Sequence, residues 1–169
     1  MGVEPSHNDI RLAREAQGYL ELELWPEALE RANGLLERDV LVEAALAIKG
    51  EAYRGQERFE DGAGVFEQIL ATDPESVHAW VMLGWCRKRT GRLDLALKAM
   101  EGLLDVKPRE GIGLYNLACY CALDGQHERA LHLLERAVDA EEEFRKHALT
   151  EEDLDPIRQD PEFRRIVGA

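Results

Sequence analysis

The sequence predicts an all-α fold built from four helix–turn–helix repeats, and three observations carry this prediction. Small residues recur every 34 positions in one column: Ala28, Gly62, Ala96 and Ala130. They recur in a second column with the same spacing: Ala16, Gly50, Gly84 and Ala118. Pro74 and Pro108 are also 34 apart, and no run of alternating β-branched residues predicts a strand. Small residues are needed where paired helices cross closely, so the columns predict repeated helix pairs.

The most complete motif lies in the third repeat. It consists of Trp80, Leu83, Gly84, Gly91, Ala96, Met100 and Pro108. Written as Trp-x₂-Leu-Gly, then Ala-x₃-large apolar, then Pro, it resembles the tetratricopeptide repeat of 34 residues. The resemblance implies an α-α superhelix, or solenoid, that binds other proteins. Single positions depart from the family pattern, such as Val40 where a closing proline is expected and Arg87 in the tyrosine column.

The first two repeats are expected at 9–42 and 43–76, after a flexible lead-in at 1–8. Apolar residues at helical spacing predict a helix over 9–23, and Pro26 suits the first position of a second helix that reaches residue 37. The next two helices are expected over 43–54 and 59–71. The turn at 73–76 ends with Ser76, a suitable N-cap before Val77.

The third and fourth repeats are expected at 77–110 and 111–144. Helices are predicted over 77–90 and 93–105, interrupted at Gly91, and over 111–123 and 127–140, interrupted at Gly125.

C-terminal capping helices are expected in the remaining segment, 145–169. Thr150 before three acids predicts an N-cap, as do Asp155 and Asp160, each of which precedes a proline. A repeat array needs a cover for the exposed face of its last unit. The candidates for this cover are Leu154, Ile157, Phe163 and Ile166. The run from Leu154 to Phe163 also resembles the tail that often follows the last repeat in bacterial members of the family.

The charge balance argues against nucleic acid and membranes as partners. The chain has 169 residues with 21 Lys and Arg against 34 Asp and Glu, a formal net charge of −13. Such a surface repels phosphate backbones and anionic lipids. The chain has no apolar run long enough to span a bilayer, and its start lacks the pattern of a signal peptide. We therefore expect a cytoplasmic protein.

No constellation of residues predicts catalysis, a metal or a cofactor. His127 and His132 are five apart, about 140° around a helix, and do not form the metalloprotease pattern. Cys119 and Cys121 point roughly 200° apart on a helix, which does not suit a shared metal. With Cys86 they are expected to be small buried hydrophobes. We expect a protein without enzyme activity.

The candidate binding residues follow from the resemblance. In this family one stripe of each first helix lines the concave surface. In the third repeat that stripe is His78, Val81, Trp85 and Lys88. The register implies Gln17 in the first repeat, Glu51 and Arg54 in the second, and Tyr115 and Cys119 in the fourth. Arg89 joins the set because it lies about one helical turn after Trp85.

Charge indicates the chemistry of the partner. The third repeat has seven Lys and Arg against four acids, net +3, whereas the other repeats come to −4, −5 and −5 by the same count. A basic region beside Trp85 in an acidic protein favours a peptide or helix with an apolar anchor and nearby acids. The alternative for these cations is solvated residues at a helix C-terminus, where positive charge is favoured.

One class of partner, the C-terminal tails of chaperones, is not expected. The positions that clamp a chaperone C-terminal carboxylate in some family members hold Ala13, Gln17, Ile48, His78 and Met82 here. This set cannot form that clamp.

The leading prediction is a binding module for a protein or peptide. The alternative is a structural subunit whose groove is filled by its own tail or by another copy, for example in a homodimer.

Overall fold

The computed structural model describes residues 4–168, and every regular element in this range is a helix. The predicted all-α class is therefore confirmed. The chain divides into two compact units, residues 4–90 and 91–168, with the boundary after Thr90 inside the third predicted repeat. Within residues 4–168, no helix is both long enough and apolar enough to cross a membrane.

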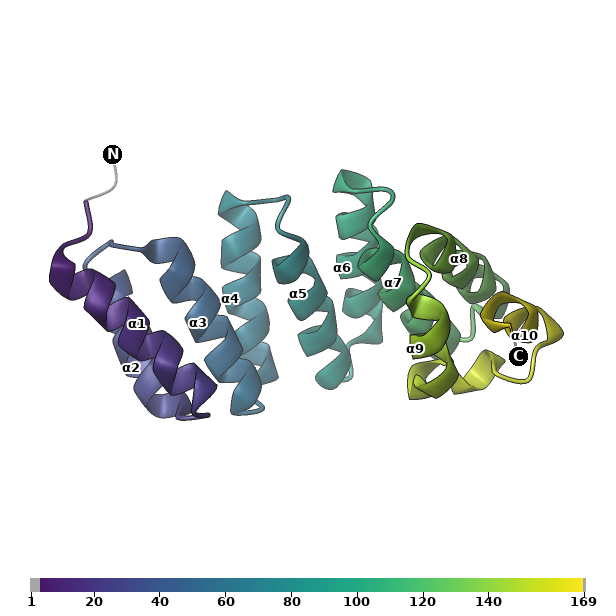
Figure 1. Cartoon of the computed structure of the whole chain (residues 1–169), viewed down its shortest axis with the longest axis horizontal. Helices are drawn as coiled ribbons and strands as arrows, with labels where there is room; N and C mark the ends of the chain where they lie inside the picture. The colour runs from purple at the N-terminus through teal and green to yellow at the C-terminus, as the bar shows by residue number, and fades with distance from the viewer. Residues whose placement is uncertain (1–3, 169) are drawn as a thin grey trace. The chain divides into compact units, whose positions relative to one another are not determined.

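Five helices make up the described part of the first unit. They are α1 (His7–Glu21), α2 (Trp25–Leu36), α3 (Val42–Gly55), α4 (Phe59–Thr72) and α5 (Val77–Arg89). Each helix packs against the next in sequence, and α1 also contacts α3 (Figure 1). α1 begins before residue 9 because Ser6 and Asp9 form a capping box. The expected lead-in is correspondingly shorter, and its residues 1–3 lie outside the described residues.

The second unit, described over residues 91–168, contains a stack of three longer helices followed by three short ones. They are α6 (Leu93–Val106), α7 (Gly111–Leu123), α8 (His127–Ala140), α9 (Phe144–Thr150), the 3₁₀ helix η1 (Glu152–Ile157) and α10 (Pro161–Val167). α7 packs between α6 and α8 and also contacts η1. α10 contacts α8 and α9.

The buried small residues allow large partners to approach. A Cβ atom added to Gly50 would lie 2.8 Å from Cζ of Phe66, because this ring of α4 packs directly on the backbone of α3. One repeat earlier, the equivalent positions are Ala16 and Ala32, which belong to one core cluster and are fully buried. The pair Gly50–Phe66 thus combines the smallest residue with a large ring, whereas the equivalent pair is Ala16–Ala32. The small residue offsets the large one, so the packed volume differs less between the two repeats.

The turn between the two helices of each repeat has a left-handed residue at the same position. These residues are Glu23 (φ 58°), Glu57 (φ 58°), Gly91 (φ 74°) and Gly125 (φ 78°), each 34 after the last. Glycine adopts this conformation freely, whereas another L-residue there costs about 1 kcal/mol. The sequence indicated turns at Gly91 and Gly125 but did not predict the same conformation at the two glutamates.

Arg158 ties the short C-terminal helices together. Its guanidinium donates to the backbone oxygen of Leu149 at 2.7 Å and to that of Glu151 at 2.6 Å, where α9 ends. Its Nε donates to the Asp155 carboxylate at 2.7 Å, and the same guanidinium lies 5.7 Å from the centroid of the Phe163 ring. One side chain therefore satisfies the C-terminus of α9 and contacts both following helices.

Two of the predicted caps in this segment are wrong. Thr150 is the last residue of α9, and the side chain of Glu151 caps η1 instead. Pro156 lies inside η1 rather than at the first position of a helix, because η1 is a short 3₁₀ helix. The third cap is confirmed, since Asp160 caps α10 and Pro161 begins it. The four residues expected to form the cover are buried: Leu154, Ile157, Phe163 and Ile166.

Gly62 and Gly50, one from each column of small residues, lead to opposite predictions for the stability of an alanine variant. At Gly62 the nearest atom to an added Cβ is Sγ of Cys86 at 3.4 Å, an ordinary contact. Gly62→Ala should therefore raise the free energy of unfolding by roughly 0.5–1 kcal/mol through helix propensity. Gly50→Ala should lower it by about 1–3 kcal/mol, because the buried Phe66 ring occupies the space. Urea denaturation of both variants measures these changes, and equal effects of the same sign would contradict the packing described here.

The second prediction concerns Arg158. Arg158→Lys keeps the charge but loses the planar fork, so several backbone oxygens at the end of α9 lose their donor. We expect the free energy of unfolding to fall by about 1–3 kcal/mol, with faster proteolysis after residue 140. Arg164→Lys is the matched control, because exposed Arg164 makes one side-chain hydrogen bond, to Gln159. Equal stability of the two variants would mean that Arg158 does not hold this segment.

Candidate peptide-binding site

A cavity of about 350 Å³ opens between α3 and α5 in the first unit. It is lined by Glu51, Arg54, His78, Met82 and Trp85, which we call the α3–α5 groove. Four of these five residues belong to the set predicted from the sequence. They meet because residues 51 and 54 are one turn apart on α3, while 78, 82 and 85 follow one face of α5.

Trp85 is the aromatic centre of the groove. Its ring meets that of Phe59 edge to face, with centroids 5.2 Å apart and an interplanar angle of 85°. The guanidinium carbons of Arg54 and Arg89 lie 5.7 Å and 5.5 Å from the indole centroid. Trp85 is half-buried, so part of the ring is fixed by its neighbours and part is open to a ligand. A rigid, partly exposed indole beside guanidinium groups suits an apolar side chain with an adjacent acid.

The acid of the groove, Glu51, is already paired within the chain. The carboxylate of Glu51 accepts a hydrogen bond from Nε of Arg54 at 2.8 Å and lies 3.2 Å from Nε2 of His78. Glu51 is largely buried, with 24% of its side chain exposed. Arg54 on α3 therefore compensates the charge of Glu51, whereas the second carboxylate oxygen, Oε1, faces His78 of α5 and is buried without a hydrogen bond. The guanidinium of Arg89, by contrast, lies over the rings of Phe59 and Trp85 and forms no ion pair with a carboxylate in residues 4–168.

The positive charge of α5 divides into two groups. Arg87 donates to Glu60 at 2.6 Å and to Glu67 at 2.7 Å, so both of its partners lie on α4. The hydrogen bond with Glu67 is the main cause that raises the pKa of Arg87. Arg87 is therefore engaged within the first unit, in agreement with its place outside the concave stripe. Arg89 retains an exposed side chain beside the groove.

The structure does not bring the whole predicted set together. Gln17 is exposed on α1 and donates to Glu21 at 3.4 Å. Val81 and Lys88 lie half-buried on α5 but do not line the cavity.

Tyr115 and Cys119 lie in the second unit, and the chain itself covers them. The Tyr115 ring stacks on Phe144 with centroids 4.7 Å apart and an interplanar angle of 18°. Tyr115 and Cys119 are only 5% and 2% exposed. Burial also raises the pKa of the Tyr115 hydroxyl. The predicted concave face of the fourth repeat is therefore filled by the C-terminal segment in this structure.

Comparison with known proteins decides the family. The tetratricopeptide repeat model matches residues 49–110 and again residues 82–144, more than half of the chain. The chain belongs to the tetratricopeptide repeat family. Known structures with the same fold include MamA 41-end from Desulfovibrio magneticus RS-1, which is 17% identical, with a TM-score of 0.75 and coverage of 96% of this chain and 91% of that one. A crystal structure of MamA protein is 14% identical, with a TM-score of 0.76 and coverage of 95% and 86%. A comparison with the curated proteins finds no match.

The candidate binding set from the sequence missed Met82, which lines the groove, and Phe59, which packs against Trp85 beside it. The tetratricopeptide period contains a signal for Phe59. Phe59 begins α4, and its equivalents 34 residues away are Trp25 and Leu93, a column of large apolar residues. Trp25 packs over Gly55 in the same way that Phe59 meets Arg89 one repeat later. Met82 had no comparable signal, because it lies outside the stripe of α5 that the family register assigns to the concave surface.

Proposed function

We propose that this tetratricopeptide repeat protein is a non-enzymatic binding module whose α3–α5 groove takes an apolar side chain from a peptide or helix of a partner protein. The observation that carries the proposal is Trp85, half-buried on a cavity of about 350 Å³. Family membership supports a protein-interaction role in general. The groove supplies the specific site.

The partner segment should place an acid beside its apolar anchor. Arg54 is held by Glu51, but Arg89 stacks on two rings and has no carboxylate partner in residues 4–168. A carboxylate from the partner would complete this arrangement at the edge of the groove. Because Arg89 is exposed, its attraction acts mainly on the association rate and weakens as salt increases.

A structural subunit whose groove is filled by its own tail is the alternative. One observation favours this alternative for the concave face of the fourth repeat, where Phe144 of the chain's own C-terminal segment stacks on Tyr115. The α3–α5 groove, which lies wholly in the first unit, is lined by residues of α3 and α5 alone. We therefore assign the groove to a partner, and a second copy of the chain is tested as one possible partner.

The test begins with a pull-down by the immobilised chain, followed by titration calorimetry with the partner obtained. Trp85→Ala should weaken binding about thirtyfold, because truncating an interface tryptophan costs roughly 2 kcal/mol or more. Arg89→Glu should weaken it several-fold at low salt and less at high salt. Circular dichroism should show unchanged helical content in both variants.

The matched control is Arg14→Glu, the same change of charge at an exposed arginine on α1 that has no partner in the described residues. It should leave the affinity unchanged apart from the general effect of added negative charge. If Trp85→Ala binds as tightly as the original chain while folded, the groove is not the binding surface. Analytical ultracentrifugation of the chain alone shows whether a second copy occupies it.

A further inference from the structure

The turn between α1 and α2 leaves two leucines in solvent. Leu22 follows the last residue of α1, and Leu24 precedes the first residue of α2. Leu22 is 69% exposed, more than any other large apolar side chain in residues 4–168, and Leu24 is 40% exposed. We call residues 22–24 the Leu22 turn.

The other repeats have polar residues at both of these positions. At intervals of 34 residues, the C-caps equivalent to Leu22 are Gln56, Thr90 and Asp124. The N-caps equivalent to Leu24 are Arg58, Arg92 and Gln126. The same helix–turn–helix unit therefore forms without leucine at either position. Exposed apolar side chains that the fold does not require indicate an interaction surface.

Backbone hydrogen bonds hold the Leu22 turn in one conformation. The N–H of Leu24 donates to the oxygen of Tyr19 at 2.8 Å, and the N–H of Glu23 donates to that of Leu20 at 3.0 Å. Glu23 is in the left-handed conformation, with φ 58°. A turn that is fixed before binding loses little conformational entropy when it docks, which favours its use as a ligand.

Exposed acids surround the two leucines. Glu21, Glu23 and Glu27 are exposed and form no ion pair in the described part of the chain. The Leu22 turn therefore combines an apolar side chain with nearby acids, the chemistry expected of a ligand for the α3–α5 groove. In that groove the indole of Trp85 is half-buried, and Arg89 forms no ion pair with a carboxylate in residues 4–168. The two surfaces are complementary in charge and in polarity.

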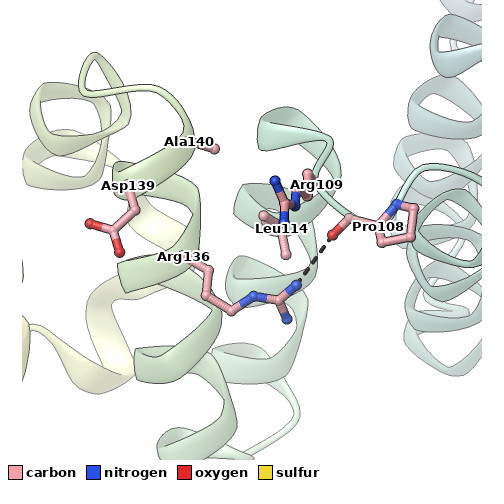
Figure 2. A pocket seen from close by; sticks show the side chains of 6 residues that line it. All are labelled: Pro108, Arg109, Leu114, Arg136, Asp139 and Ala140. Atoms are coloured by element: carbon pink, nitrogen blue, oxygen red, sulfur yellow. Dashed lines mark hydrogen bonds between the residues drawn. The ribbon is translucent and has the colours of Figure 1, made fainter.

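A cavity of about 490 Å³ in the second unit matches the Leu22 turn less well. Its lining residues are Pro108, Arg109, Leu114, Arg136, Asp139 and Ala140 (Figure 2). Leu114 is only 2% exposed, so it offers an incoming leucine little apolar surface. Figure 2 shows that Arg136 donates to Pro108 and that Asp139 projects from the same helix. An acidic segment would meet the negative charge of Asp139 there, whereas both arginines beside Trp85 attract it.

We propose that the Leu22 turn docks in the α3–α5 groove of a second copy of this chain, with Leu22 on the indole of Trp85 and an acid of the turn beside Arg89. The inference rests on the proposed function, because it names the occupant of the same groove. The contact joins two different surfaces, and each copy carries both of them. Because the acids and Arg89 are exposed, added salt weakens the contact.

Sedimentation velocity of the full chain, at concentrations up to roughly 1 mM, measures the self-association. We expect the association to weaken as salt increases. Leu22→Gln with Leu24→Gln should weaken it at least about tenfold, because two apolar side chains lose their burial. Glutamine is the residue that the chain itself has at the equivalent positions 56 and 126. Trp85→Ala should weaken the association about thirtyfold.

Leu149→Gln is the matched control, because Leu149 is 46% exposed on α9, outside both surfaces. It should leave the self-association unchanged. Circular dichroism of every variant should show the helical content of the original chain.

A mixing experiment tests the pairing of turn with groove. The double leucine variant keeps its groove, and the Trp85→Ala variant keeps its turn. With one variant labelled with fluorescein, the mixture should therefore associate several-fold more tightly than either variant alone. The inference is overturned if the original chain stays monomeric, if the control loses as much affinity, or if the mixture associates no better than its components. A monomeric chain whose pulled-down partner still requires Trp85 would overturn this inference alone and leave the proposed function in place.

Discussion

Close approach of the paired helices is the constraint on which the rest of this structure depends. In the first unit α4 can lie against α3 because Gly50 leaves room for the ring of Phe66. This contact fixes the rotation of α3 about its axis. Glu51, the next residue, is then placed about 100° further round, facing α5. The groove residues are thus positioned by a packing requirement that contains no binding chemistry.

Much of the fold could be predicted because this constraint repeats at a fixed interval. Small residues and prolines 34 apart predicted the eight helices of the repeats to within two residues at most ends. The left-handed turns at Glu23 and Glu57 were not predicted, because glutamate carries no local preference for that conformation. The caps at Thr150 and Asp155 failed for a related reason. The guanidinium of Arg158 holds that segment by hydrogen bonds to the backbone oxygens of Leu149 and Glu151, nine and seven residues earlier. A local capping pattern does not reveal such bonds.

The candidate site was predictable only in part. Register along α3 and α5 correctly grouped Glu51, Arg54, His78 and Trp85. Register could not show that Arg87 would be engaged by two acids of α4, nor that Phe144 would cover Tyr115. These outcomes depend on contacts between residues 20 or more apart in the sequence. Such contacts distinguish Arg87, which forms ion pairs within the first unit, from Arg89, which has no carboxylate neighbour in residues 4–168.

Site-specific photo-cross-linking tests the assignment of the binding surface most directly. A benzophenone amino acid is introduced at His78, which lines the α3–α5 groove, and separately at Gln68, which is exposed on α4 and does not line it. The chain is then irradiated in its native extract, and the captured proteins are identified. The account predicts one specific partner cross-linked from position 78, little or none from position 68, and competition by the unlabelled original chain. Equal capture from both positions, or capture from position 68 alone, would contradict it.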